Sequence, residues 1–267
     1  MNFADRLRAA FGDGAFGQLE QAYLHRARRA DSLGELVGRD ALIASDIALA
    51  AQIGTAEVSA FTTSTVTLTA RGFRQHRWIE REGERILHEW IVSDLILVAE
   101  ERAARGELLG AAYPAQPPLG ELRSGRGQLS AGPTAAFTGE PQALIDTLHR
   151  IWNGRCLDQL AALYSADGRW SGPGGKGGDA DAARAWILGL LARLPDATLL
   201  FERVEAEADR VALLWRLFGH IGGVRARLIG SSLLTLDEDG RIREDDTLID
   251  ELALEATPHR AHQVIVR

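Results

Sequence analysis

The chain repeats one order of predicted elements, and this repeat constrains the fold more than any other feature. In each half, a first helix leads to a second helix and then to several strands joined by glycine turns. The second helices are expected at residues 39–52 and 179–194, and the strands that follow include residues 65–69 and 210–215. Helices followed by antiparallel strands are typical of an α+β domain, so we expect two copies of such a domain.

Local sequence matches align the two copies. Residues 18–23 (QLEQAY) match residues 159–164 (QLAALY), and the final hairpins overlay without gaps, which pairs Ile86 with Ile242. The offset between the copies is 141 residues at the two tyrosines and 156 at the hairpins, so the first copy is 15 residues shorter between these points. We therefore expect the first copy to lack part of a hairpin.

A segment rich in proline and glycine separates the copies. It includes five of the eight prolines when Pro141 is counted, a composition typical of a linker. We predict one domain at residues 1–105, a linker at 106–138 and a second domain at 139–267. Each piece has a normal domain size.

The charge balance limits the partners. With a net charge of -7, the chain lacks the positive surface that nucleic-acid binding requires. No stretch approaches the roughly 18 apolar residues of a membrane helix, and the N-terminus carries charges where a signal peptide would be apolar. We expect a soluble, cytoplasmic protein of bacterial type whose partner is a small molecule, with no nucleic acid and no membrane.

The residue inventory also limits the chemistry. The single cysteine, Cys156, excludes an intrachain disulfide, and the single lysine, Lys176, does not stand in a phosphate-binding P-loop pattern. His259 and His262 have no nearby third ligand, so we expect no metal site and no cofactor. Any catalysis must then rest on carboxylates, histidines and the shape of an apolar pocket.

The second half resembles the SnoaL-like polyketide cyclases, a family of the nuclear transport factor 2-like superfamily. The resemblance covers residues 140–256 and rests on Trp152-Asn153, Leu157-Asp158, Gly178, Leu194-Pro195-Asp196, Asp209-Arg210-Val211, Gly219-His220, Gly222, Asp239-Gly240-Arg241-Ile242 and Asp250. The first half matches only at Gly38, Arg85-Ile86, Trp90 and Asp94, as a degenerate copy would. The resemblance implies two tandem cone-shaped barrels, each a curved antiparallel sheet wrapping helices. It also implies that the two domains pack as an internal pseudo-dimer, and it leaves a homodimer open.

The same resemblance implies a function and two site residues. Asp250 would act as the acid/base of a cofactor-independent cyclase or isomerase on a small apolar, polyketide-like carbonyl compound, and His220 would lie near the pocket. Two features depart from the family: Gly219 and His220 are adjacent, and Asp246 replaces a common tryptophan. Two alternatives remain open. One is a non-catalytic small-molecule-binding protein, and the other is an epoxide-hydrolase-like enzyme using Asp250, Asp246 and Arg227.

Strand alternation predicts further residues of the second pocket. In a strand from Ile242 to Asp250, even positions share a face, which places Glu244 and Asp246 beside Asp250 in the cavity. The alternative is that Glu244 and Asp246 belong to a solvated acidic edge. Tyr164, Trp170 and Trp186 are candidates to line the cavity, although aromatic residues at helical spacing often serve packing alone.

The first half has a matching set. His88, Trp90 and Asp94 share the even face of the corresponding strand, and a two-residue turn at Glu82-Gly83 would place Arg77 opposite His88. These residues could form a pocket for an anionic or aromatic ligand, or they could be core.

Overall fold

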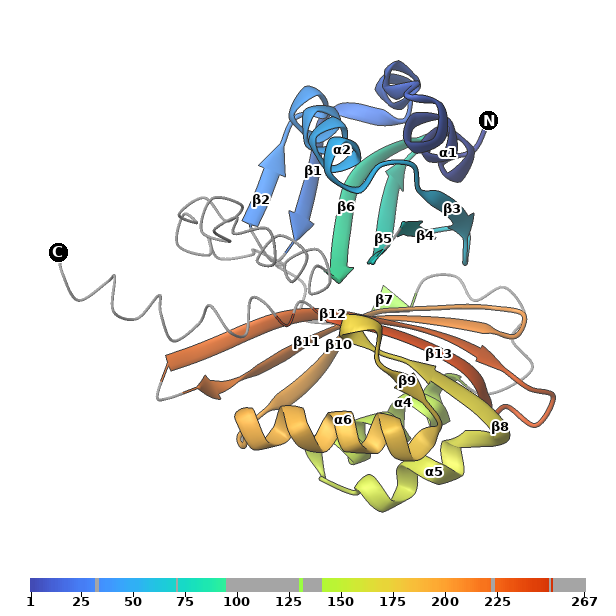
Figure 1. Cartoon of the computed structure of the whole chain (residues 1–267), viewed down its shortest axis with the longest axis vertical. Coiled ribbons are helices and arrows are strands. Elements are labelled where there is room, and N and C mark those ends of the chain that lie inside the picture. The colour runs from blue at the N-terminus through green and yellow to red at the C-terminus, as the bar shows by residue number, and fades with distance from the viewer. Residues whose placement is uncertain are drawn as a thin grey trace, which may run out of the picture. The chain divides into compact units, whose positions relative to one another are not determined.

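The chain divides into two compact units, Met1–Gly125 (unit 1) and Arg126–Arg267 (unit 2). The computed structural model describes residues 1–31, 34–70, 72–94, 130–131, 141–221, 224–249 and 251, and Figure 1 shows them in colour. The predicted linker at 106–138 lies outside the described residues, apart from residues 130–131.

Unit 1 consists of one six-stranded sheet with helices on it. The helices are α1 (Phe3–Asp13), the 3₁₀ helix η1 (Phe16–Gln21) and α2 (Arg39–Ile53). The strands are β1 (Tyr23–Asp31), β2 (Gly34–Val37), β3 (Glu57–Ala60), β4 (Thr65–Ala70), β5 (Phe73–Glu82) and β6 (Arg85–Asp94). Their order in the sheet is β2-β1-β6-β5-β4-β3, and the β1–β6 pair is parallel whereas the other pairs are antiparallel.

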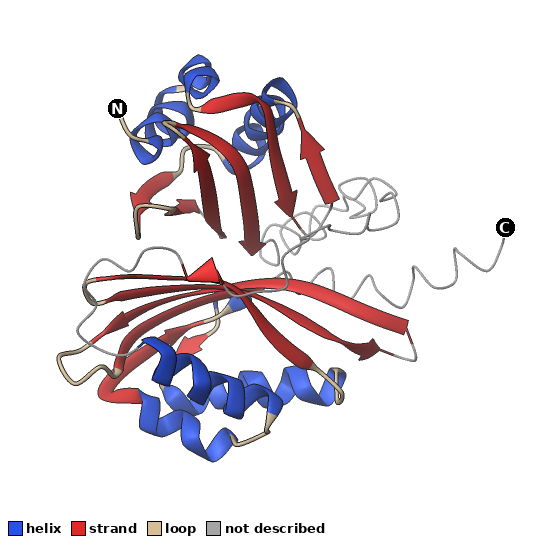
Figure 2. Cartoon of the chain, turned by 180° about the vertical axis from the view of Figure 1, so that it is seen from behind, coloured by secondary structure: helices blue, strands red, loops and turns tan. Residues whose placement is uncertain are grey.

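Unit 2 has a seven-stranded sheet with its helices on one face (Figure 2). The helices are α4 (Pro141–Asn153), η3 (Leu157–Gln159), α5 (Leu160–Leu163), η4 (Pro173–Gly175) and α6 (Ala180–Arg193). The strands are β7 (Ser130–Ala131), β8 (Tyr164–Ser171), β9 (Gly177–Gly178), β10 (Thr198–Glu207), β11 (Arg210–Ile221), β12 (Val224–Leu236) and β13 (Ile242–Ile249). Their order is β7-β10-β11-β12-β13-β8-β9.

The two sheets have the same topology, which confirms the predicted α+β repeat. Apart from β7, the strands of unit 2 correspond one to one with those of unit 1, and β8 and β13 form a parallel pair as β1 and β6 do. The alignment of the tyrosines is also confirmed, because Tyr23 pairs with Ile86 and Tyr164 with Ile242. Each sheet is mostly antiparallel with a parallel pair at the tyrosine strand, and it stays open rather than closing into the expected cone-shaped barrel.

The shorter copy has lost length in one hairpin, as the sequence predicts. Strands β3 and β4 have 4 and 6 residues, whereas the corresponding β10 and β11 have 10 and 12. The second helices remain almost equal, at 15 residues in α2 and 14 in α6. The loss therefore shortens the free end of the sheet in unit 1 and leaves the strands beside the tyrosine intact.

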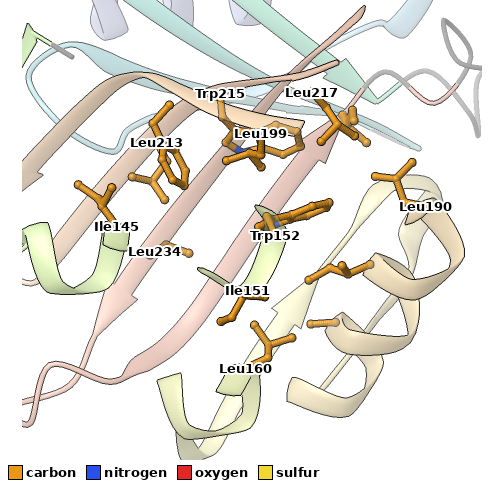
Figure 3. Packing of buried hydrophobic residues seen from close by; sticks show 14 of the residues in the cluster. Ile145, Ile151, Trp152, Leu160, Leu190, Leu199, Leu213, Trp215, Leu217 and Leu234 are labelled. Carbon is orange, nitrogen blue, oxygen red and sulfur yellow. The ribbon is translucent and has the colours of Figure 1, made fainter. Parts of the chain in front are cut away.

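The core of unit 2 lies between its helices and the inner face of its sheet. Figure 3 shows Ile151 and Trp152 of α4 facing Leu213 and Trp215 of β11. Helix α6 begins at the N-cap Asp179, whose side chain accepts hydrogen bonds from the first turn, and it adds Ile187 and other apolar residues to the same cluster. Four tryptophans, Trp152, Trp170, Trp186 and Trp215, belong to this layer.

The Trp215 ring packs directly against Gly230 of the neighbouring strand. The two residues are direct partners on β12 and β11, and a Cβ atom added at Gly230 would lie 2.2 Å from the indole ring. We therefore expect Gly230→Ala to displace Trp215 and to lower the free energy of unfolding by about 1–3 kcal/mol. Gly189→Ala in α6 is the control, because no atom lies within 4 Å of its added methyl. Denaturant unfolding followed by tryptophan fluorescence measures both, and equal stabilities would contradict this account.

Candidate functional site

A pocket in unit 2 lies between the helices and the inner face of the sheet. Its apolar walls are formed by Leu148, Trp152, Leu160, Tyr164, Trp170, Ala183, Trp186, Ile187, Leu199, Phe201, Leu213, Trp215, Leu234 and Ile242. Its polar atoms come from Ser232, Asp245, Thr247 and the Tyr164 hydroxyl. The free volume is about 40 Å³, room for roughly three water molecules. The lining, apolar with a few converging polar groups, is typical of a small-molecule site, although the free volume is well below that of most such sites.

Four tryptophans form a continuous aromatic wall. Trp186 packs against Trp170 with ring centroids 5.6 Å apart and against the edge of Trp152 at 6.1 Å. Trp152 in turn contacts Trp215 at 6.1 Å. Trp152, Trp170 and Trp215 are buried, whereas Trp186 is only partly buried. The wall offers flat apolar surface to a ring-shaped ligand, and Trp186 is its most accessible member.

A chain of hydrogen bonds crosses the polar end and converges on Asp245. The Trp215 indole N–H donates to Ser232 Oγ at 3.1 Å, and the hydroxyls of Ser232 and Thr247 are 2.7 Å apart. Thr247 Oγ1 donates to Asp245 Oδ1 at 2.6 Å, and the Tyr164 hydroxyl donates to Asp245 Oδ2 at 2.5 Å. Because Thr247 has one hydroxyl proton and donates it to Asp245, Ser232 donates to Thr247 while it accepts from the Trp215 indole. The carboxyl group is thereby fixed in one orientation.

The environment of Asp245 favours a carboxyl group that exchanges protons near neutral pH. Burial raises the pKa of Asp245 to about 6, although the hydrogen bonds from Thr247 and Tyr164 act in the opposite direction and Asp246 adds to the rise. Burial and the neighbouring carboxylate raise the pKa of Tyr164 well above its ordinary value, so its hydroxyl keeps its proton. Asp245 is therefore the group in this pocket suited to take and return a proton.

A β-bulge brings Asp245 into the pocket in place of the predicted residues. Ile242 pairs with Leu236 and Glu244 with Thr235, so Arg243 is an extra residue that shifts the alternation by one position. Asp245, Thr247 and Ile249 consequently face inward. The expectation for Glu244 and Asp246 is wrong, because Glu244 is exposed and Asp246 points to the opposite face. Asp250 lies outside the described residues.

His220 does not reach the pocket. Inward residues of β11 are the odd ones, Val211 to Leu217, and the register to β12 is unbroken, so His220 lies on the opposite face of the strand. Its Nδ1 lies 2.6 Å from Asp196 Oδ2, its backbone N–H donates to the same carboxylate, and its side chain is 55% exposed. The hydrogen bond from His220 lowers the pKa of Asp196. The structure thus places His220 in a surface pair with Asp196, outside the pocket.

In unit 1 the corresponding space holds buried charges. The repeat offsets place Arg29 at the position of Trp170, Asp46 at Ile187 and Glu89 at Asp245, and Arg77 takes the place of Ser232 in the strand pairing. Each carboxylate bridges both arginines: Asp46 lies 2.9 Å from Arg29 and from Arg77, and Glu89 lies 2.7 and 3.3 Å from them. All four side chains are at most 2% exposed. In unit 1 a buried ion-pair cluster therefore occupies the position that corresponds to the pocket of unit 2.

Each copy retains a tyrosine hydroxyl on its carboxylate. Tyr23 donates to Glu89 Oε2 at 3.0 Å, as Tyr164 donates to Asp245. The overlay of the hairpins that pairs Ile86 with Ile242 also pairs Glu89 with Asp245. An acid at the same position of both copies is the sequence signal that could have identified Asp245.

The residues predicted for a pocket in unit 1 lie on the opposite face of β6 from Glu89. His88 Nδ1 contacts Glu80 Oε2 at 3.2 Å, the rings of His88 and Trp90 are 5.8 Å apart, and Asp94 forms an ion pair with Arg74 at 3.6 Å. Two details of the hairpin explain the error. The turn falls at Gly83 and Glu84, and the register shifts beside Arg81, so Arg77 pairs with Ile91 rather than with His88.

The described residues contain neither a metal site nor a membrane-spanning helix. No group of three or more His, Cys, Asp or Glu side chains there is arranged to hold a metal ion. In the same part of the chain, no helix is long and apolar enough to cross a membrane.

Comparison with protein families gives one match, over residues 145–245, to a sequence model described as the SnoaL-like domain. Unit 2 contains a SnoaL-like domain. The match includes the pocket walls from Leu148 to Ile242 and ends at Asp245. A search of curated proteins found no match.

Three of the solved structures that are similar to this chain illustrate the range of descriptions. IdmH, a candidate polyketide cyclase from Streptomyces antibioticus, is 19% identical, with 45% of this chain and 99% of IdmH covered and a TM-score of 0.41. A candidate SnoaL-like polyketide cyclase from Jannaschia sp. CCS1 is 20% identical, with 42% of this chain and 89% of that chain covered and a TM-score of 0.37. AclR, a candidate hydroxylase from Streptomyces galilaeus, is 22% identical, with 42% and 80% covered and a TM-score of 0.37.

Proposed function

We propose that the SnoaL-like domain of this chain is a cofactor-independent enzyme that moves a proton on a small apolar carbonyl compound, as a cyclase or isomerase does. The observation that carries the proposal is Asp245, a carboxyl group with a pKa of about 6 at the polar end of a pocket lined by tryptophans. A general base works best when its pKa lies near the working pH. Burial has moved this aspartate toward that range.

The chemistry needs only the residues of the pocket. The Asp245 carboxylate takes a proton from the carbon next to a carbonyl group, and the electron pair of the C–H bond moves to the carbonyl oxygen to give an enolate. In an isomerase the acid returns the proton to another carbon. In a cyclase the enolate carbon attacks a second carbonyl carbon, and the resulting alkoxide takes the proton back. The fixed orientation of the carboxyl group supports either outcome, because proton transfer depends on geometry.

The hydrolase alternative finds less support. It requires an arginine between two carboxylates around a reacting water molecule, and none of the described residues that line the pocket is basic. Asp246 points away from the pocket, and the Arg227 guanidinium stacks on the Phe218 ring at 5.6 Å, on the same outer face.

Deuterium exchange tests the proposed activity without knowledge of the natural substrate. We expect the purified chain to accelerate exchange of the α-protons of 2-tetralone in D₂O, followed by proton NMR, above the rate in buffer alone. This probe is a neutral bicyclic ketone that matches the apolar walls and carries acidic C–H bonds. If 2-tetralone binds and its protons exchange only at the buffer rate, the domain is a binding protein and the proposed enzyme activity is wrong.

A further inference from the structure

The charges inside the pocket and at its edge have opposite sign. Among the described residues that line the interior, the ionisable groups are Asp245 and Tyr164, and none is basic. An anion placed inside would lie beside the Asp245 carboxylate and lose its hydration without a positive partner. The interior therefore selects against anionic groups and accepts neutral ring systems.

A cation is linked to the edge of the pocket, on the glycine-rich loop before α6. Lys176 is the only lysine of the chain, and its Nζ lies 3.3 Å from both carboxylate oxygens of Glu251. Glu251 Oε1 also accepts the indole N–H of Trp186 at 2.9 Å. Trp186 lines the pocket, so two contacts connect the Lys176 ammonium with the aromatic wall.

The loop that carries Lys176 packs against the tryptophan wall at Trp170. A Cβ atom at Gly172 would lie 2.1 Å from the Trp170 ring, so the backbone lies directly against this indole. The Gly172 N–H donates to the Lys176 carbonyl at 2.8 Å, and Gly174 and Gly175 have positive φ angles of 67° and 70°. The glycines thus hold Lys176 beside the two most closely packed tryptophans, Trp170 and Trp186.

The ion pair between Lys176 and Glu251 is weak enough for another anion to replace Glu251 on the lysine. The Lys176 side chain is 50% exposed and that of Glu251 is 14% exposed, so water screens the pair on the lysine side and its contribution is small, on the order of 1 kcal/mol. The free volume of about 40 Å³ is too small for a ring compound, so a ligand must displace part of the wall. Trp186 is the partly buried member, and it is held from outside by Glu251.

We propose that the pocket selects compounds that combine a neutral apolar ring system with one acidic group. The rings lie between the tryptophans, and the acidic group replaces Glu251 on Lys176, which releases Trp186 from its outer hydrogen bond. This inference names the substrate class of the proposed function and rests on it for the location of the site. It assigns Lys176 as the specificity-determining residue.

Calorimetric titration with a matched pair of probes tests this assignment. We expect 2-naphthoate to bind the full chain about fivefold more tightly than the neutral 2-naphthamide, which is the effect of about one exposed ion pair. Lys176→Met removes this preference and Lys176→Arg retains it. Glu251→Gln raises the affinity for 2-naphthoate, because Lys176 no longer has a competing carboxylate.

Two controls separate the outcomes. Arg243→Met removes a surface cation that lies 3.9 Å from Asp209, and it leaves the preference for 2-naphthoate unchanged. Asp245→Asn loses proton exchange and keeps the preference, so failure of the proposed activity and failure of this inference are distinguishable. Equal affinity for the two probes in the wild type, or an unchanged preference in Lys176→Met, overturns the proposal.

Discussion

Glu89→Gln is expected to destabilise unit 1 by about 3–5 kcal/mol. The substitution keeps the shape of the side chain and removes one negative charge from a cluster of two arginines and two carboxylates that are at most 2% exposed. The cluster then holds an uncompensated positive charge away from water, and breaking a buried pair in this way has a cost of that size. Denaturant unfolding followed by the fluorescence of Trp78 and Trp90 measures the change.

The pKa directions of Arg29, Asp46 and Arg77 are those of ionised groups. Burial by itself would lower the pKa of Arg29, but Asp46 and Glu89 raise it above its ordinary value. Burial would likewise raise the pKa of Asp46, yet Arg29 and Arg77 lower it. Each charge is therefore stabilised by its partners alone, and loss of one partner is costly.

A surface pair provides the matched control. Glu82 forms an ion pair with Arg26, and both side chains are more than half exposed. Glu82→Gln should change the free energy of unfolding by less than about 1 kcal/mol.

A second comparison removes the whole cluster, in the combined variant R29M/D46L/R77M/E89L with Tyr23→Phe. It should unfold at a higher denaturant concentration than Glu89→Gln, because no buried charge is left unpaired. If Glu89→Gln costs no more than Glu82→Gln, the cluster does not support unit 1.

The order of elements was predictable because hydrophobic spacing and glycine turns are local signals. The match of residues 18–23 with 159–164 aligned the two copies, and the offsets located the shortened hairpin, but the strands β1 and β8 that begin at the matched tyrosines were not predicted. The parallel pairing of β1 with β6 joins segments about 60 residues apart, and no local pattern reports it. The sequence therefore predicts the elements and their repetition better than it predicts how the sheet is ordered.

The site was less predictable, and one extra residue in a strand explains most of the difference. Alternation from Ile242 places Glu244 inside only if the strand is regular, whereas the bulge at Arg243 turns Asp245 inward. The register shift recurs in unit 1, where Glu89 faces inward between His88 and Trp90. Such a bulge depends on pairing with two neighbouring strands, so it leaves no signal in the strand itself.

The equivalent carboxyl groups of the two copies, Glu89 and Asp245, lie in different surroundings. A tyrosine hydroxyl on a carboxylate is common to both, at Tyr23 with Glu89 and at Tyr164 with Asp245. In unit 1 two arginines form ion pairs with the carboxylate and fill the space. In unit 2 tryptophan and serine replace them, none of the described residues that line the pocket is basic, and burial raises the pKa of the carboxyl group. The difference between a closed core and a candidate active site is thus the loss of the neighbouring positive charges.

Asp245→Asn is expected to lower the rate of proton exchange on 2-tetralone by about 100- to 10,000-fold, the contribution typical of a general base. In the wild type, the carboxylate is the active form, so activity should rise with pH through a midpoint of about 6. The Asn variant has no group that titrates there, and this limb of its pH profile should be absent. NMR exchange rates between pH 4 and 8 measure both effects.

Unfolding does not explain such a loss. The folded-state pKa of Asp245 is raised, so the stability that its protonated form contributes is present at low pH and is lost as pH rises through about 6. A neutral amide avoids this loss, and the Asn variant should be as stable as the wild type at pH 8. Asp246→Asn is the matched control, because it removes the adjacent carboxylate on the opposite face and should retain exchange near the wild-type rate. A wild-type rate in Asp245→Asn, or an equal loss in both variants, would show that the base lies elsewhere.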